Sequence, residues 1–176
     1  ELGYRTAGSR AEFEAGEFLY RRMSEMGLKT EKHPVVLDGW EFCGATLTYQ
    51  TEDGERTIRL GGYQTNLEVK DLKTELVDAG KGTEKDFLKT DVRGKIALIR
   101  INQRDEWWIN YPACQAHLAG AAAVIAVQDK GYGEVDPAAL NAQDICGLPN
   151  APAFSMSKSD MAAVLSEMKK GRLEVV

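Results

Sequence analysis

The sequence contains few of the residues that build reactive centres: three cysteines and two histidines among 176 residues. Cys43, Cys114 and Cys146 are odd in number and form no Cys-x-x-Cys pair, so they predict neither a disulfide framework nor a thiolate zinc site. We interpret them as small apolar residues. His33 and His117 lack the spacing of a zinc-binding helix, and a hydrolytic zinc site needs about three protein ligands.

Long apolar runs and an excess of positive charge are also missing. No apolar run approaches the ~18 residues of a membrane-spanning helix. The formal net charge is -5, from 22 Lys and Arg against 27 Asp and Glu, so neither a nucleic acid nor a membrane is expected as a partner. Hydrophobic residues make up 43% of the chain, enough to bury the core of one domain, or of one domain with an appendage.

No strong catalytic motif is present. Gly61-Gly62 and Gly80-Lys81-Gly82 do not match a dinucleotide or phosphate loop. Cys114 and His117 lie three residues apart in a predicted helix, which leaves a Cys-His dyad as a distant alternative without an orienting group or an oxyanion donor. We therefore expect no catalytic residue, no metal site and no cofactor in this chain.

The first half of the chain changes from a helical to a strand-like pattern. Ser9–Met26 predicts an amphipathic helix that Ser9 caps and Gly27 ends. Phe13 and Tyr20 lie opposite its main apolar stripe, so this helix needs two neighbours. Three β-rich runs separated by Asp-Gly turns then predict a meander or a sheet edge. These runs are Glu31–Leu37, Glu41–Tyr49 and Arg56–Leu60.

The second half predicts a strand, helix, strand crossover. Lys95–Ile101 and Ala121–Val127 are apolar enough to be buried on both faces, and Asn110–Ala119 between them is helical. Further strands are predicted at Glu75–Asp78, Ala151–Ser155 and Leu173–Val176, with capped helices beginning at Thr83 and Ser157. The expected fold class is α/β: a small mixed sheet or open barrel flanked by two or three helices, plus an N-terminal helix and strands.

Several short sequence segments occur in a fixed order in the second half. They are Glu75–Thr83, Asp86-Phe87, Asp91–Ile99, Ala119–Ala126 and Asn150–Ser155, the last followed by a capped helix. The ordered set resembles the protease-associated (PA) domain, from about Glu75 to Val176.

The N-terminal flank extends this resemblance. Gly3–Ala15 and Met26–Leu28 are similar to the first helix of zinc-dependent aminopeptidases related to the glutamate carboxypeptidase group. In that family a PA domain is inserted early in the peptidase. The resemblance implies that residues 1–70 begin the peptidase domain and that residues 71–176 form the PA domain. The zinc ligands of the family match no position here, so zinc is expected in a peptidase domain encoded beyond Val176.

Two functions follow from the resemblance and the residues. The first is a non-catalytic accessory domain that covers the active site of a secreted or periplasmic zinc aminopeptidase and contributes to substrate selection or protein interaction. Its partners are the remainder of the peptidase chain and a peptide or protein substrate, and it predicts an exposed apolar patch. The alternative is a stand-alone module that binds peptide or protein, which predicts a closed surface.

Aromatic residues after a buried strand are the candidate contact residues. Trp107 and Trp108 occupy a polar loop, and loops at the carboxyl ends of strands often bind ligands. Asp105 and Tyr111 share the loop. Arg104 is a candidate to meet a peptide carboxylate, with a solvated surface arginine as the alternative. The alternative is that one tryptophan fills the core while the other covers the sheet edge.

A long polar stretch, Lys130–Asn150, provides the second candidate surface. Tyr132 and Leu148 are its candidate contacts with a peptide or the peptidase domain. The alternative is a surface excursion that covers the core.

Overall fold

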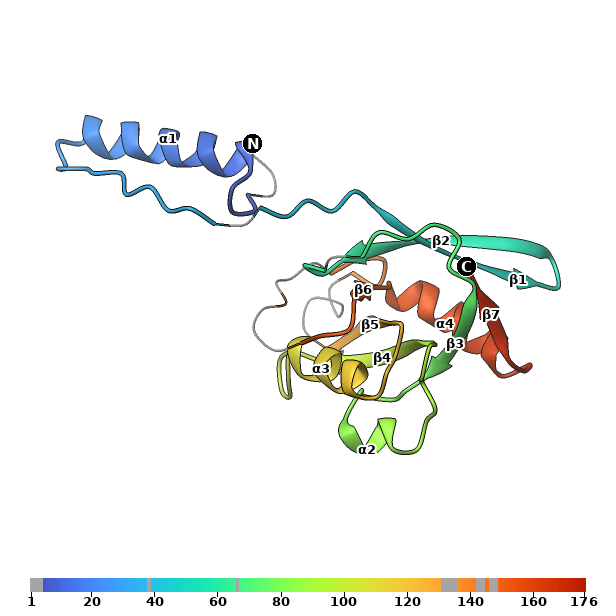
Figure 1. Ribbon diagram of the computed structural model, residues 1–176. Helices are drawn as coiled ribbons and strands as arrows, with labels where there is room; N and C mark the ends of the chain where they lie inside the picture. Colours follow the sequence, from blue (N-terminus) through green and yellow to red (C-terminus); the bar gives the residue numbers. More distant parts are fainter. Residues whose placement is uncertain (1–4, 38, 66, 131–135, 142–144, 146–148) are drawn as a thin grey trace. The chain divides into compact units, whose positions relative to one another are not determined.

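The computed structural model describes residues 5–37, 39–65, 67–130, 136–141, 145 and 149–176 (Figure 1). They form two compact units, Glu1–Phe42 and Cys43–Val176. The described residues contain four helices and seven strands. In chain order these are α1 (Arg10–Glu25), β1 (Ala45–Thr51), β2 (Gly54–Gly62), β3 (Thr74–Asp78), α2 (Glu84–Phe87), β4 (Ile96–Asn102), α3 (Asn110–Leu118), β5 (Ala123–Lys130), β6 (Ala153–Ser155), α4 (Lys158–Met168) and β7 (Leu173–Val175).

Helix α1 of the first unit begins and ends where its sequence predicts. The Ser9 hydroxyl accepts a hydrogen bond from the Glu12 backbone N–H at 3.1 Å, and the Glu12 carboxylate accepts one from the Gly8 N–H at 3.2 Å. Gly27 follows the helix at φ +79°, a conformation that glycine adopts without steric cost. None of the residues Arg10–Glu25 is buried.

An extended segment follows α1 in place of the predicted strand Glu31–Leu37, and that prediction is wrong. Lys32 ties the segment to the helix: its ammonium pairs with Glu17 and lies 4.5 Å from the centroid of the Tyr20 ring. β1 begins at Ala45, so the predicted run from Glu41 also starts too early. A strand needs a paired neighbour to satisfy its backbone groups, and β1 has one only from Ala45, opposite Leu60.

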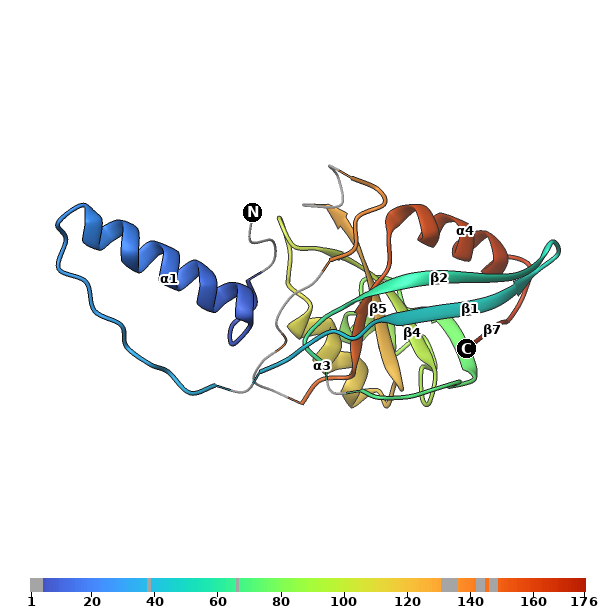
Figure 2. The same cartoon turned by 90° about the horizontal axis from the view of Figure 1, so that it is seen from above.

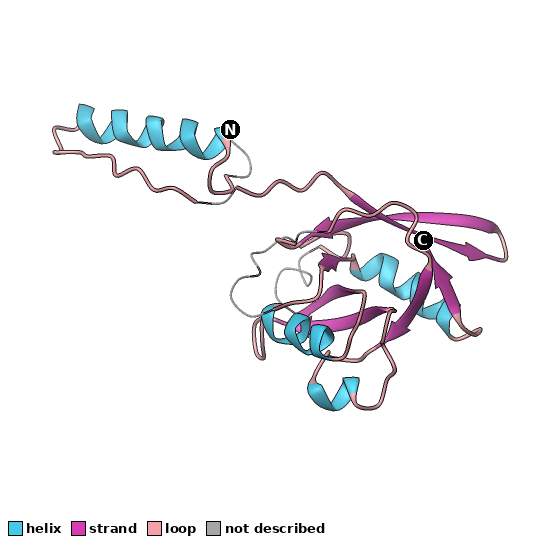
Figure 3. Cartoon of the chain, viewed as in Figure 1, coloured by secondary structure: helices cyan, strands magenta, loops and turns pink. Residues whose placement is uncertain are grey.

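The seven strands of the second unit form a closed barrel in the order β1-β2-β6-β5-β4-β3-β7. Figure 3 shows the strands in magenta and the helices in cyan. Strands β3, β4, β5 and β6 are parallel, whereas β1, β2 and β7 pair antiparallel with their neighbours. This confirms the α/β class and the mixed sheet, and it shows that the sheet closes. The sequence division into residues 1–70 and 71–176 stays a prediction, since β1 and β2 complete the barrel while the compact unit begins at Cys43.

The parallel strands separate two apolar cores. In β4 the side chains of Ile96 and Leu98 belong to one core, and those of Ala97 and Ile99 belong to the other. The first core includes Val164 of α4, and the second includes the buried alanines of α3. Because alternate residues of a strand point to opposite faces, α3 and α4 cover opposite faces of this part of the sheet. The predicted burial of β4 on both faces is confirmed.

Helix α4 packs against the hairpin of β1 and β2 as well as the core (Figure 2). Arg56 of β2 lies 3.8 Å from Asp160, and Lys170 lies 3.0 Å from Glu52 in the hairpin turn. Val164 is completely buried. The apolar stripe of α4 is therefore its packed face, and its other members are Met161, Leu165 and Met168.

Candidate functional site

The candidate aromatic residues lie at the carboxyl edge of the parallel strands. We call residues 103–109, between β4 and α3, the aromatic loop. β4 ends at Asn102, and α3 begins after Ile109, which supplies no side-chain cap. Pro112 lies in the first turn of α3, where its missing N–H costs nothing. The loop therefore passes directly from a buried strand to a helix whose first turn carries Tyr111.

The two tryptophans occupy different environments. Trp107 is half-buried and meets Tyr111 edge to face, with ring centroids 5.3 Å apart and planes at 61°. The Trp107 indole Nε1 is buried and has no hydrogen-bond partner among the described residues. Trp108 is 60% exposed and Tyr111 40% exposed. Trp107 thus contacts Tyr111, and the two exposed side chains, Trp108 and Tyr111, form the accessible part of the predicted site.

Asp105 fixes the start of the aromatic loop. Its carboxylate accepts a hydrogen bond from the Asn102 amide at 3.2 Å, and its backbone N–H donates to the Asn102 side-chain oxygen at 3.1 Å. Arg104 Nε donates to the same carboxylate at 3.4 Å, and Lys130 Nζ lies 3.7 Å away. The bond from Asn102, with the charges of Arg104 and Lys130, lowers the pKa of Asp105. Asp105 is therefore ionised at neutral pH and stabilises the loop.

A hydrogen bond joins the described part of Lys130–Asn150, the second candidate surface, to the aromatic loop. Asn141 donates from its amide to the Tyr63 hydroxyl at 3.1 Å and to Gln103 of the aromatic loop at 3.5 Å. Its backbone carbonyl accepts from Ser155 of β6. Tyr63 is completely buried, and burial raises its pKa well above the usual value. Tyr132 and Leu148 lie outside the described residues, so their predicted contacts stay predictions.

Sequence analysis did not identify Asn141 as the residue that attaches this loop to the barrel. The glycine at position 61 is a sequence signal for the close approach that this attachment requires. A Cβ at Gly61 would lie 2.3 Å from the Ser155 hydroxyl and 2.8 Å from the Asn141 carbonyl. Only glycine allows this close approach of β2 to the loop. The glycine pair at 61–62 therefore marks a packing site.

The structure gives no support to the alternative Cys-His chemistry. No hydrogen bond joins Cys114 to His117 among the residues described, and Cys114 is half-buried while His117 is exposed. Within the same residues, no group of three or more His, Cys, Asp or Glu side chains could hold a metal ion. Each helix of the described chain is too short or too polar to cross a membrane.

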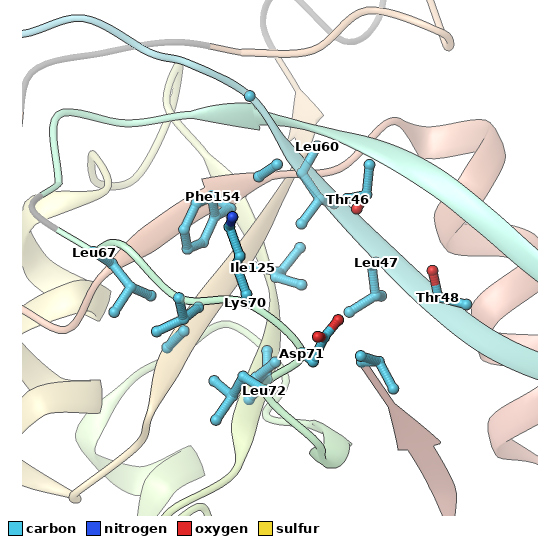
Figure 4. A pocket seen from close by; sticks show the side chains of 16 residues that line it. Thr46, Leu47, Thr48, Leu60, Leu67, Lys70, Asp71, Leu72, Ile125 and Phe154 are labelled. Atoms are coloured by element: carbon cyan, nitrogen blue, oxygen red, sulfur yellow. The ribbon is translucent and has the colours of Figure 1, made fainter.

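A pocket of about 400 Å³ lies at the start of β1 and near the amino ends of β4 and β5 (Figure 4). Its walls are mostly aliphatic and include Phe154 of β6. Residues 67–72, which follow β2, form one side and contribute Lys70 and Asp71. None of the predicted site residues that the structure describes lines this pocket. The sequence signal was weak, since residues 67–72 mix apolar and charged side chains and form no strand.

The chain resembles a known protein family in sequence and several solved structures in fold. The family profile described as PA domain matches residues 69–164, more than half of the chain. No curated protein sequence matches the chain.

Solved structures match 99% of this chain. One is a zinc aminopeptidase from Bacillus subtilis, with 26% identity, a TM-score of 0.65 and 39% of that chain covered. An aminopeptidase from Aneurinibacillus sp. strain AM-1 has 23% identity, a TM-score of 0.68 and 40% coverage. A peptidase M28 precursor from Shewanella amazonensis has 17% identity, a TM-score of 0.72 and 43% coverage. The chain thus spans about two fifths of these proteins.

Proposed function

Because this chain belongs to the PA domain family, we propose that it is the non-catalytic accessory domain of a zinc-dependent aminopeptidase. In this role it covers the active site and contributes to substrate selection. The observation that carries the proposal is the match of 99% of the chain to aminopeptidases of which it spans only about two fifths. The parent protein would then hold its zinc ligands in a peptidase domain outside these residues.

The apolar surface of α1 supports a docked peptidase domain over a stand-alone module. Phe13 is 65% exposed, Leu19 57% and Met26 74%. An amphipathic helix gains most of its stability from packing its apolar face, and α1 has no buried residue. A self-contained recognition module predicts a closed surface, whereas an accessory domain predicts an apolar face that a neighbouring domain covers.

The aromatic loop is the proposed contact with substrate. Trp108 and Tyr111 present large, rigid side chains at the carboxyl edge of the sheet, and such residues often dominate peptide and protein binding. Trp107 contacts the Tyr111 ring edge to face, and Asp105 holds the chain at the start of the loop. Tyr132, in the stretch Lys130–Asn150, is proposed as a further contact with a peptide or the peptidase domain. The parent is proposed to be secreted or periplasmic, as the family resemblance implies.

A substrate series in the parent enzyme tests the role of the loop. Trp108→Ala is expected to change the ratio of kcat/KM between long and short peptides several-fold, because a truncated contact tryptophan costs over about 1 kcal/mol. Leu118→Ala, at the other end of α3 and 69% exposed, is the matched control and should leave the ratio unchanged. Equal ratios in wild type and Trp108→Ala would contradict substrate selection by this loop.

A second assay tests whether the chain is non-catalytic. The 176-residue chain, supplied with zinc, is incubated with aminoacyl p-nitroanilides, and no release of nitroaniline is expected. Turnover that copurifies with the folded chain would contradict the accessory role.

A further inference from the structure

The pocket beside residues 67–72 opens onto the core of the barrel. We call residues 67–72 the strap. The floor of the pocket consists of core side chains, among them Leu47, Leu60 and Ile125, and the strap adds Leu67 and Leu72. Its volume of about 400 Å³ falls in the range of small-molecule sites, which are mostly apolar with a few polar groups. This pocket therefore suits a small ligand with an apolar side chain.

Two opposite charges lie at this pocket. Lys70 and Asp71 are consecutive strap residues that line it, and both are exposed. The structure records no ion pair or hydrogen bond for either side chain among the described residues. In Figure 4 the Lys70 side chain extends toward Phe154, while the Asp71 carboxylate is directed toward Leu47. One cation and one anion are thus available to a ligand at different points of the same pocket opening.

The backbone of Asp71 is unusual. Its φ of +56° is in the left-handed region, where it is the only residue other than glycine among those described. Aspartate tolerates this region better than most residues, but such conformations are held by their surroundings and often occur at functional sites. The conformation turns the strap at the residue that presents the carboxylate.

We propose that this pocket binds a free hydrophobic α-amino acid. The aliphatic floor takes the side chain, the Asp71 carboxylate takes the α-ammonium group, and the Lys70 ammonium takes the α-carboxylate. This site is separate from the aromatic loop, and its chemistry does not depend on the proposed function. In an aminopeptidase the ligand would belong to the class of product that the enzyme releases, so the pocket would sense product.

Ligand analogues test each part of the assignment. L-leucine is titrated into the 176-residue chain, with backbone amide shifts of the pocket residues followed by NMR. Glycine should not bind, because it lacks the apolar side chain. N-acetyl-leucine lacks the ammonium and leucinamide lacks the carboxylate, so each should bind at least about tenfold more weakly than leucine.

Strap variants locate the two charges. Asp71→Asn, which also tolerates positive φ, and Lys70→Met should each weaken leucine binding about tenfold. Glu68→Gln and Lys73→Met change neighbouring charges that do not line the pocket, and they should bind leucine as wild type does. Amide spectra of each variant check that the barrel is intact.

Three results would overturn the proposal. Leucinamide binding as tightly as leucine would assign the pocket to a peptide N-terminus. Equal affinity for leucine in wild type, Asp71→Asn and Lys70→Met would show that neither charged side chain binds the ligand. The absence of amide shifts with leucine, up to its solubility limit, would exclude the free amino acid. None of these results bears on whether the parent is an aminopeptidase.

Discussion

Helices α1 and α4 share a local design but differ in burial. Each follows a serine whose hydroxyl accepts a hydrogen bond from the backbone N–H three residues on, Glu12 in one case and Asp160 in the other. Each carries an apolar stripe. Val164 of α4 is completely buried in the barrel core, whereas no residue of α1 is buried. The comparison teaches that capping and periodicity specify a helix, while burial depends on what the rest of the chain places beside it.

The largest effect is expected from a charge placed on the two apolar stripes. Val164→Asp should lower the free energy of unfolding by at least about 4 kcal/mol, because it buries a carboxylate without a partner. Leu19→Asp in α1, at a position 57% exposed, should change it by less than about 0.5 kcal/mol. Urea denaturation followed by circular dichroism measures both.

The stability of Leu19→Asp can also be measured in the proposed parent enzyme. There Leu19→Asp should become strongly destabilising if, as we propose, the peptidase domain covers the α1 stripe. A large loss of stability from Leu19→Asp in the 176-residue chain itself would show that Leu19 is buried there, as Val164 is.

The two serine caps offer a smaller effect. Ser157 is buried and its hydroxyl is 3.0 Å from the Asp160 N–H, so Ser157→Ala should cost about 1 kcal/mol of the unfolding free energy. Ser9→Ala removes the equivalent bond in α1 and should reduce helical ellipticity at 222 nm without shifting the urea midpoint of the barrel. A shift of that midpoint by Ser9→Ala would mean that α1 contributes to barrel stability.

The cap of α2 gives the smallest effect and a dependence on pH. Desolvation is the largest single influence on the Asp86 carboxyl and raises its pKa, but hydrogen bonds from the Thr83 hydroxyl and from the Thr83 and Lys81 N–H groups together lower the pKa. The ionised cap therefore stabilises the fold fully above the unfolded pKa of about 3.9. This stabilisation is lost as the pH falls through the lower pKa of the folded state.

Asp86→Asn tests the contribution of this carboxylate. At pH 7 the variant should lose up to roughly 1 kcal/mol of stability, and its difference from wild type should shrink below about pH 4. Urea midpoints between pH 7 and pH 3 measure the effect. Glu84→Gln removes an equal charge from the same turn without removing the cap, and a pH profile for it like that of Asp86→Asn would disprove the specific role of Asp86.

Local signals predicted most elements of the barrel unit. Thr83 and Ser157 form the predicted caps, and the apolar runs that became β4 and β5 are buried on both faces. These features depend on neighbours within four residues or on the burial of a continuous apolar run. The strand prediction at Glu31–Leu37 failed because strand propensity forms no strand where no second strand pairs with it.

The candidate site was predictable in position but not in detail. The placement of Trp107 and Trp108 after a buried strand located the aromatic loop, yet only the structure separates the half-buried ring from the exposed one. Asn141 and Tyr63 are 78 residues apart in sequence, so no local pattern could join them. No sequence motif marked Lys70 and Asp71, which the folded barrel unit places beside an apolar pocket.

The amino-acid order alone determined where most helices start and stop, which strands are apolar throughout, and the family to which the chain belongs. Closure of the barrel was decided by long-range pairing, in which Tyr49 meets Val175 and Gly62 meets Phe154. Such pairs join segments far apart in the sequence, and the apolar pattern of one strand does not specify which distant strand it pairs with. Core packing between distant segments likewise buries Val164 of α4, the serine-capped helix of the barrel unit.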